Sequence, residues 1–240
     1  MVARLAAEHL RRRSMTQANE PDFSELGAVL FDLDGTLVDS VPQVGEAAAE
    51  AVRNLGYEAT PEQILSVLGP PLVDVLGELL KIDRDESKRI YQEYVRLYAE
   101  KYIPQTPAMP GVIPLLDALA DSGLRVAVVT NKLEEAGRAV IEVMGWEERF
   151  FTVVGNDTAE RAKPHADPAL HALQLIDLPP ERAVLVGDSA ADMGCAVNAG
   201  LHSGIGMKGL TSEAALREAG ASHYCGDLSA LFALLMGRSS

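Results

Sequence analysis

Short apolar runs that stop abruptly at a polar residue constrain the fold of this chain more than any of its other features. Three of them are residues 28–32 (AVLFD), 125–130 (RVAVVT) and 183–188 (AVLVGD). A run of this length and composition predicts a strand that is buried on both faces, as the strands of a parallel sheet are. In open α/β sheets, ligands bind at the carboxyl ends of such strands. The sequence therefore predicts an α/β fold with a polar site at one edge of its sheet.

Two acidic residues, Asp32 and Asp34, lie at the end of the first run and are separated by a single residue. Two carboxylates so close together repel each other unless a cation lies between them or one of them holds a proton. Gly35 then permits a tight turn, and Thr36 adds a hydroxyl. The arrangement suits one acid that attacks, a second that transfers a proton, and a metal ion that binds both. An ordinary strand end with an aspartate-glycine turn is the alternative interpretation of these residues alone.

Polar residues also follow the other two runs. Thr130 ends the second run, Asp188 ends the third, and Asp192 follows four residues later in the predicted first turn of a helix. Lys163 lies in a polar loop between these runs, directly before a proline. Parallel strands that bring Asp32, Thr130 and Asp188 to one sheet edge predict a single site there. Taken alone, Lys163 could be a solvated loop residue, and Asp192 could simply cap its helix.

Four segments taken in chain order, FDLDGTL, VTN, KP and GDSAAD, resemble the four motifs of the haloacid dehalogenase superfamily of phosphotransferases. The resemblance extends over about residues 26–236. Within that superfamily, the segments DLDGTLVDS, TNK and KPHADP are most similar to the phosphoglycolate phosphatase group. The resemblance implies a Rossmann-like core, with a doubly wound and mostly parallel sheet, into which a small helical cap domain is inserted. Strand and helix patterns alternate after residue 110, which agrees with this fold class.

The expected domain organisation follows from the place where a helical pattern interrupts the strand pattern. Apolar residues repeat at helical spacing over residues 44–55, and a helix-start signature follows at residues 60–63. The pattern of strands resumes after a proline-rich linker. The expected parts are a flexible N-terminal extension (residues 1–25), a Rossmann-like core (26–38 and 111–237) and a helical cap with hinge linkers (39–110).

Three groups of cap residues are candidates for contact with a substrate. The first is a tyrosine stripe, for which packing inside the cap is the favoured interpretation because of its helical spacing. The second is the rigid turn at residues 69–72 (GPPL), which the resemblance places facing the active site. The third is a basic cluster that could bind a carboxylate, with a solvated surface as its alternative role. The stripe is Tyr91, Tyr94, Tyr98 and Tyr102, and the basic cluster is Lys81, Arg84, Lys88 and Arg89.

The resemblance implies a catalytic role for several motif residues in the hydrolysis of a phosphate ester. Asp32 attacks phosphorus and forms an aspartyl-phosphate, which splits one difficult step into two. Asp34 protonates the leaving oxygen and then takes a proton from the water that hydrolyses the intermediate. The Thr130 hydroxyl and the Asn131 backbone hold phosphoryl oxygens. Lys163 also binds the phosphoryl group, where it offsets the negative charge of that group and of Asp32.

The same resemblance implies one Mg²⁺ ion as the cofactor. Its protein ligands are expected to be the side chains of Asp32 and Asp188 and the backbone carbonyl of Asp34. Asp192 is expected to act through a metal-bound water, because Mg²⁺ keeps several of its waters when a protein binds it. These four residues are the predicted metal site.

The carboxylate at Asp34 also restricts the class of reaction. Dehalogenases of the superfamily resemble this motif but lack a carboxylate two residues after the nucleophile, and its transport ATPases have threonine there. We therefore expect a phosphomonoesterase, and the resemblance to phosphoglycolate phosphatases implies 2-phosphoglycolate as its substrate. A phosphosugar mutase and a pyrophosphatase of the same superfamily are alternatives, and a non-catalytic phosphate-binding module is a third.

The charge of the chain restricts its partners. Its 21 Lys and Arg against 35 Asp and Glu give a net charge of −14, which argues against nucleic acid or an anionic membrane as a partner. The expected partner is a small phosphorylated metabolite, and the chain is expected to be a monomer or homodimer. Cys195 and Cys225 have no metal-ligand spacing, so we expect buried thiols in a reducing cytoplasm.

Overall fold

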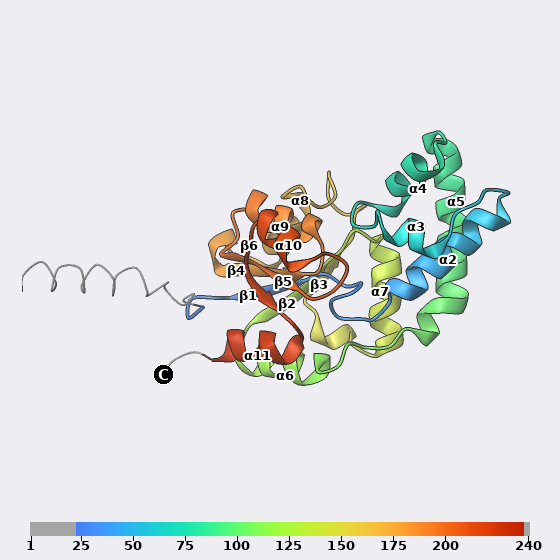
Figure 1. The fold of residues 1–240 in the computed structure, drawn as a ribbon. Coiled ribbons are helices and arrows are strands. Elements are labelled where there is room, and N and C mark those ends of the chain that lie inside the picture. The colour runs from blue at the N-terminus through green and yellow to red at the C-terminus, as the bar shows by residue number, and fades with distance from the viewer. Residues whose placement is uncertain (1–22, 238–240) are drawn as a thin grey trace, which may run out of the picture.

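The computed structural model of this chain describes residues 23–237 (Figure 1). Within them, six strands form one sheet in the order β3-β2-β1-β4-β5-β6, and every neighbouring pair is parallel. The prediction of an α/β fold with a doubly wound sheet is therefore confirmed. The strands are β1 (Ala28–Phe31), β2 (Arg125–Val129), β3 (Thr152–Val154), β4 (Ala183–Gly187), β5 (Ser203–Met207) and β6 (Ala221–Cys225).

Helices cover both faces of the sheet, as the apolar character of its strands requires. In β1, Val29 and Phe31 belong to the apolar cluster on one face, whereas Ala28 and Leu30 belong to the cluster on the other. All four side chains are fully buried, so both faces contribute to the core. The helices on the first face are α6 (Val112–Asp121), α7 (Glu134–Met144) and α11 (Leu228–Met236), and those on the second are α8 (Asp167–Ile176), α9 (Ala190–Asn198) and α10 (Glu213–Glu218).

The order of the strands creates a topological switch point between β1 and β4. The chain runs from β1 outward to β2 and β3, and then returns to place β4 on the other side of β1. Residues 28–31 pair with residues 125–128 on one side and with residues 183–186 on the other. The carboxyl ends of β1 and β4 therefore lie side by side, where ligands bind in sheets of this kind.

A helical insertion separates β1 from α6 and lies beyond the carboxyl ends of the strands (Figure 1). Within it, α2 packs against α3 and α5, and α4 packs against α5. Thr60 and Gln63 form the predicted capping box, in which the backbone nitrogen of each residue donates to the side-chain oxygen of the other. The insertion comprises α2 (Val41–Asn54), α3 (Pro61–Leu65), α4 (Leu72–Leu80) and α5 (Arg84–Leu97), with helical turns at Tyr98–Tyr102 and Ile103–Gln105.

Two linkers connect the insertion to the core, and they pair with each other. The backbone nitrogen of Asp39 donates to the Pro107 carbonyl at 2.9 Å, and that of Met109 donates to the Leu37 carbonyl at 2.9 Å. The two crossings therefore run side by side, close to the boundaries predicted for a cap at residues 39–110. That these paired segments act as hinges stays a prediction.

The predicted N-terminal extension, residues 1–25, lies mostly outside the described residues. Where the description begins, Phe23 is already part of the core and is 4% exposed. Its ring centroid lies 5.4 Å from that of His202 and 5.7 Å from that of His223. The chain is therefore packed against the core from Phe23 onward, ahead of the predicted boundary. Within residues 23–237, no helix combines the length and the apolar character that crossing a membrane requires.

Candidate active site

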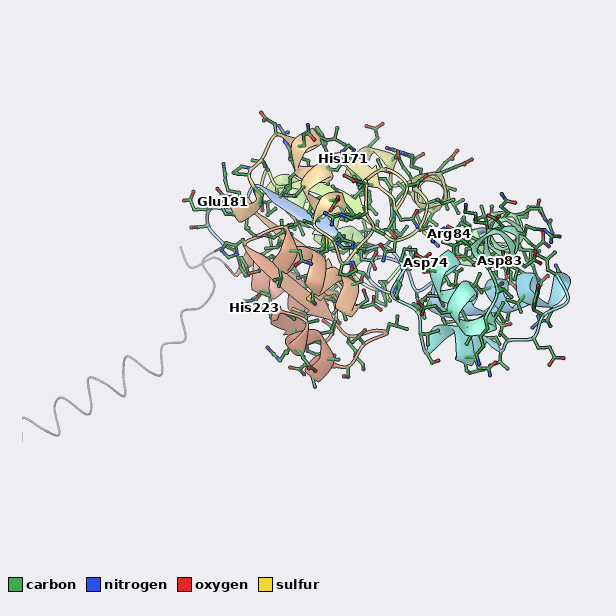
Figure 2. The ribbon with its side chains drawn as sticks, turned by 90° about the horizontal axis from the view of Figure 1, so that it is seen from above. Asp74, Asp83, Arg84, His171, Glu181 and His223 are labelled. Atoms are coloured by element: carbon green, nitrogen blue, oxygen red, sulfur yellow. The ribbon has the colours of Figure 1, made fainter. Side chains whose placement is uncertain are left out.

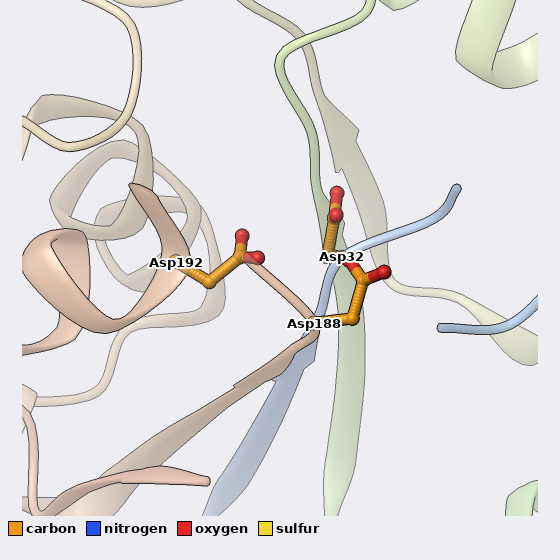
Figure 3. Close-up of side chains that lie close together, drawn as sticks. All are labelled: Asp32, Asp188 and Asp192. Atoms are coloured by element: carbon orange, nitrogen blue, oxygen red, sulfur yellow. The ribbon is translucent and has the colours of Figure 1, made fainter. Parts of the chain in front are cut away.

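Three buried aspartates come together at the switch point of the sheet (Figure 3). Asp32 follows β1, Asp188 follows β4, and Asp192 lies in the first turn of α9. Each contributes a carboxylate oxygen to a group whose members all lie within 4.8 Å of one another. Their exposed fractions are 8%, 2% and 0%, so solvent does little to screen their repulsion. The fold thus brings together the side chains of three of the four residues predicted to hold a metal.

A lysine from a distant loop lies between two of these acids. The Lys163 ammonium donates to Asp32 Oδ1 at 2.9 Å, to Asp192 Oδ1 at 2.6 Å and to the Val129 carbonyl at 2.7 Å. All three of its protons therefore have acceptors, and the residue is buried. Among the described residues, no hydrogen bond is made to Asp32 Oδ2.

Burial and mutual repulsion raise the pKa of two of the acids. Burial and the charges of Asp192 and Asp188 raise the pKa of Asp32 to about 8, against the opposing effect of Lys163. Burial, followed by the charge of Asp192, raises the pKa of Asp188 to about 7. One ammonium group does not compensate three carboxylates. Because carboxylate oxygens are ligands that Mg²⁺ prefers, this donor set fits a divalent cation of that kind.

Backbone and hydroxyl groups orient the other two carboxylates. The Leu210 nitrogen donates to Asp188 Oδ2 at 2.8 Å. The backbone nitrogen and the hydroxyl of Ser189 donate to Asp192 Oδ2 at 3.0 and 2.6 Å, within the capping box that begins α9. Asp192 is thus a helix cap, the alternative role that its position suggested, and also a partner of Lys163. Both oxygens of its carboxylate are engaged.

Two glycines leave space around Asp188. Gly35 has a backbone φ of +79°, in the left-handed region that favours glycine. A Cβ atom added to Gly35 would lie 2.4 Å from Asp188 Oδ2, and one added to Gly209 would lie 2.3 Å from the same oxygen. A larger residue at either position would therefore displace this carboxylate. Gly35 therefore permits the turn after Asp34 and also leaves room for the Asp188 carboxylate.

The Asp34 carboxylate belongs to a second ion pair rather than to the group of three acids. Its Oδ1 accepts a hydrogen bond from the Ser40 hydroxyl at 2.5 Å, and its Oδ2 lies 3.1 Å from the Lys132 ammonium. The Asp34 side chain is 20% exposed and the Lys132 side chain only 5%. The predicted role of Asp34 as a metal ligand concerns its backbone carbonyl, so the carboxylate remains available for proton transfer.

Neither Lys132 nor Ser40 is among the residues predicted from the sequence. Lys132 lies two residues after Thr130, whose Oγ1 accepts a hydrogen bond from the Lys132 backbone nitrogen at 3.2 Å. Its place at the end of a predicted strand is the one signal that could have identified it. Ser40 has no such signal, because its contact depends on how the loop after β1 turns back toward Asp34.

Asn131 connects the helical insertion to the core. Its Nδ2 donates to the Gly69 carbonyl at 2.8 Å and to the Lys163 carbonyl at 3.2 Å, while its Oδ1 accepts from the Lys163 nitrogen at 3.0 Å. The side-chain amide therefore holds both the loop that carries Lys163 and the turn at residues 69–72. This turn lies at the site, as the resemblance implied. Contact of the Asn131 backbone with phosphoryl oxygens stays a prediction.

A cavity of about 80 Å³ lies between the core and the insertion, and both line it. Tyr91 and Tyr94 border it, so packing inside the cap is an incomplete account of the tyrosine stripe. Asp192 does not border it and lies behind Lys163. The lining residues are Asp32, Asp34, Thr130, Asn131, Lys132, Lys163, Asp188, Ser189 and Leu210 outside the insertion, and Val41, Val44, Leu68, Gly69, Pro70, Leu72, Tyr91 and Tyr94 within it.

The basic cluster of the insertion has the solvated role rather than the carboxylate-binding one. None of its four members borders the cavity. Arg84 instead pairs with Asp74 at 3.0 Å, and its side chain is 69% exposed. Figure 2 shows both residues together on the insertion. The basic cluster therefore places no cation at the cavity.

A Lys163→Met variant is expected to be less stable than the wild type in the absence of divalent metal. Removal of one member of a buried charge network leaves Asp32 and Asp192 uncompensated, which typically costs about 3–5 kcal/mol of unfolding free energy. Urea denaturation at neutral pH with a chelator present measures the loss. Lys88→Met, at an exposed position of α5, is the matched control and should change little. Equal stability of Lys163→Met and wild type would contradict this role.

The chain resembles known hydrolases in sequence and in fold. The family model described as haloacid dehalogenase-like hydrolase matches residues 29–205. Identity to a phosphoglycolate phosphatase from Aquifex aeolicus is 33% over 183 residues, covering 75% of this chain and 84% of that protein. Identity to a pyrophosphatase from Oceanobacillus iheyensis is 28% over 165 residues, covering 69% and 76%. The crystal structure of a hydrolase from Pseudomonas syringae matches with a TM-score of 0.79 at 25% identity, covering 89% of this chain and 99% of that one.

Proposed function

The chain belongs to the haloacid dehalogenase-like hydrolase family, and we propose that it is a Mg²⁺-dependent phosphomonoesterase that acts through an aspartyl-phosphate. The observation that carries this proposal is how the two carboxylate oxygens of Asp32 are hydrogen-bonded. Asp32 lines the cavity with one oxygen bound by Lys163 and the other free of hydrogen bonds among the described residues. A module that only binds phosphate would not need an unpaired carboxylate oxygen facing that anion. The arrangement therefore supports nucleophilic attack over binding alone.

The first step transfers the phosphoryl group to Asp32. Its Oδ2 attacks phosphorus, a new P–O bond forms, and the bond from phosphorus to the leaving oxygen breaks. Lys163 holds the other carboxylate oxygen and so orients the attack. The Thr130 hydroxyl and the Asn131 backbone nitrogen would hold the phosphoryl oxygens, since both residues line the cavity beside Asp32.

Asp34 moves protons in both steps. It gives its proton to the leaving oxygen as the first P–O bond breaks, and it then takes a proton from the water that attacks the aspartyl-phosphate. That attack breaks the bond between phosphorus and Asp32 and releases inorganic phosphate. Hydrogen bonding by Ser40 and the charge of Lys132 hold the carboxylate in place for both transfers.

Mg²⁺ is the cofactor that the group of three acids would hold. When bound, it supplies positive charge between the carboxylates and the phosphoryl oxygens. The side chains of Asp32 and Asp188 and the carbonyl of Asp34 would bind it directly. Lys163 and Ser189 already engage both oxygens of Asp192, which supports contact of that residue through a water molecule.

A small phosphorylated metabolite is the proposed substrate, most specifically 2-phosphoglycolate. A cavity of about 80 Å³ that the insertion lines on one side supports a leaving group of a few atoms rather than a polymer. The Aquifex aeolicus relative is a phosphoglycolate phosphatase, which supports the specific assignment. Pyrophosphate is the second candidate, because the Oceanobacillus iheyensis relative is a pyrophosphatase.

The proposal also covers the role of the insertion, the cellular location of the protein and its oligomeric state. Residues 39–110 would act as a cap on the core at 26–38 and 111–237, closing over the substrate and excluding water. The side-by-side linkers support a hinge at this boundary. The buried free thiols of Cys195 and Cys225 support a cytoplasmic location, and the proposed oligomeric state is a monomer or homodimer.

Phosphate release is expected to require a divalent metal and to be fastest, by kcat/KM, with 2-phosphoglycolate. Chelation should abolish it, because the uncompensated acids would then repel the phosphate group, and added Mg²⁺ should restore it. The measurement is phosphate release over a panel of small esters and pyrophosphate, before and after EDTA. Circular dichroism of the chelated protein is the control for unfolding.

Two results would contradict separate parts of this proposal. Full turnover by protein stripped of metal would exclude the metal-dependent mechanism. A higher kcat/KM for pyrophosphate or hexose phosphates would exclude 2-phosphoglycolate as the preferred substrate. Interconversion of sugar-phosphate isomers, primed by a bisphosphate, would identify a mutase instead.

A further inference from the structure

Lys132 is a buried cation that faces the cavity beside the proton-transfer residue. Its ammonium lies 3.1 Å from Asp34 Oδ2, 3.5 Å from the Tyr94 hydroxyl and 4.2 Å from the centre of the Tyr98 ring. The Asp34 carboxylate is the counter-charge that a buried ammonium requires, and Lys132 thus presents a cation to the cavity.

The other basic residues of the described chain do not supply positive charge to the leaving-group side of the cavity. Lys163 borders the cavity, but two carboxylates and a carbonyl take all three of its protons. No other Lys or Arg borders it, which includes the basic cluster of the insertion. Lys132 is thus the lining cation that remains for a second anionic group of a substrate.

The position of Lys132 fits the end of the substrate that leaves. A group that transfers a proton must lie about 2.6–3.2 Å from the atom that receives it, so the leaving oxygen lies at that distance from the Asp34 carboxylate. Since the Lys132 ammonium is 3.1 Å from the Oδ2 oxygen of that carboxylate, it lies within about 6 Å of a leaving oxygen that receives its proton from Oδ2. A charged group one or two atoms beyond that oxygen can reach it.

We propose that Lys132, with Tyr94 beside it, selects phosphate compounds whose leaving group carries a negative charge one or two atoms beyond the bridging oxygen. The inference rests on the proposed phosphatase function and names the residue that sets its substrate class. The carboxylate of 2-phosphoglycolate and the second phosphate of pyrophosphate both meet this description. A charge-assisted hydrogen bond to either is about twice as strong as a neutral one, so a neutral leaving group gains less from Lys132.

The test compares Lys132→Met with the wild type on two esters that share a two-carbon leaving group, 2-phosphoglycolate and ethyl phosphate, with pyrophosphate as a third substrate. Loss of Lys132 is expected to lower kcat/KM roughly 10- to 100-fold more for 2-phosphoglycolate than for ethyl phosphate, the range for a hydrogen bond to a charged group. Competitive inhibition by glycolate should weaken by a similar factor. Lys132→Arg keeps the charge and should restore part of the discrimination.

Controls separate this role from folding and from general catalysis. Lys88→Met makes the same substitution at an exposed position of α5 and should leave all three substrates unchanged. Thermal unfolding of each variant shows whether it folds. If Lys132→Met does not fold, Lys132→Gln, which removes the charge but keeps a hydrogen-bond donor, takes its place in the same comparison, and discrimination equal to the wild type's in kcat/KM and in glycolate inhibition overturns the inference.

The outcomes distinguish failure of this inference from failure of the proposed function. Equal losses on 2-phosphoglycolate and ethyl phosphate would show that Lys132 acts only on Asp34, and would overturn the inference while the phosphatase stands. If kcat/KM fell only for pyrophosphate, Lys132 would still select an anionic leaving group, but that group would be a phosphate. If the wild type hydrolyses none of the three, the proposed function fails. Calorimetric binding of 2-phosphoglycolate and ethyl phosphate to wild type and Lys132→Met then decides the role of Lys132: equal affinities overturn it.

Discussion

An Asp32→Asn variant is expected to fold like the wild type and to lose essentially all phosphate release. The amide that replaces the carboxylate is not a nucleophile, although its oxygen can still accept the hydrogen bond from Lys163. Hydrolysis of phosphate monoesters is among the slowest uncatalysed reactions, and enzymes accelerate it by up to about 10²¹-fold. Because the proposed first step is attack by Asp32 Oδ2, we expect no measurable turnover by another route at this site. Phosphate release from 2-phosphoglycolate and from p-nitrophenyl phosphate, with saturating Mg²⁺, measures the loss.

A matched control and a second readout make this result specific to the nucleophile. Asp121→Asn makes the same substitution at an exposed position at the end of α6 and should retain full activity. Acid-quenched wild type should retain covalent phosphate from labelled substrate, whereas Asp32→Asn should retain none. Substantial turnover by a pure Asp32→Asn preparation would exclude the aspartyl-phosphate mechanism.

An Asp34→Asn variant is expected to lose roughly 10²- to 10⁴-fold in kcat, the usual contribution of a positioned proton donor. The backbone carbonyl that would contact the metal is unchanged, but an amide cannot give a proton to the leaving oxygen. The loss should therefore be greatest for alkyl phosphates such as 2-phosphoglycolate. It should be smallest for p-nitrophenyl phosphate, whose leaving group departs without a proton. Steady-state kinetics over esters of graded leaving-group pKa check the trend.

Ser40→Ala provides the comparison for Asp34. It removes the hydrogen bond to Asp34 Oδ1 but leaves the carboxylate and its ion pair with Lys132 in place. We expect a smaller loss that is similar for all leaving groups, since positioning rather than proton transfer is weakened. If Asp34→Asn also lowered the rate equally for all leaving groups, its carboxylate would have a structural role instead.

The strands and their polar ends were open to prediction from the sequence because both depend on local pattern. A strand segment buried on both faces must be apolar throughout, which makes 28–31, 126–129 and 183–187 visible as short runs. Asp32 and Asp188 follow directly from those runs. The capping box of α3 was also predictable, because its two hydrogen bonds join Thr60 and Gln63 within one turn.

The leaving-group side of the site could not be predicted in the same way. The sequence offers a basic cluster on the insertion, and helical spacing alone assigns the tyrosine stripe to packing. Which of these residues borders the cavity depends on how the insertion docks, for example through the hydrogen bond from Asn131 to Gly69, 62 positions apart. Lys132 belongs to the core, and its place beside Tyr94 and Tyr98 exists only once α5 and the helical turn that follows it pack there.

The sequence by itself determined the parts of this protein that depend on near neighbours: the parallel strands, the acids at their ends, the helix caps and the family to which the chain belongs. Only the tertiary structure decided the partners of those acids. Lys163 reaches Asp32 across 131 positions of the chain, and Asp34 is held between Ser40 and Lys132. Such pairings form because buried charges must find counter-charges and hydrogen-bond partners wherever the packed elements place them, and no local pattern records that choice.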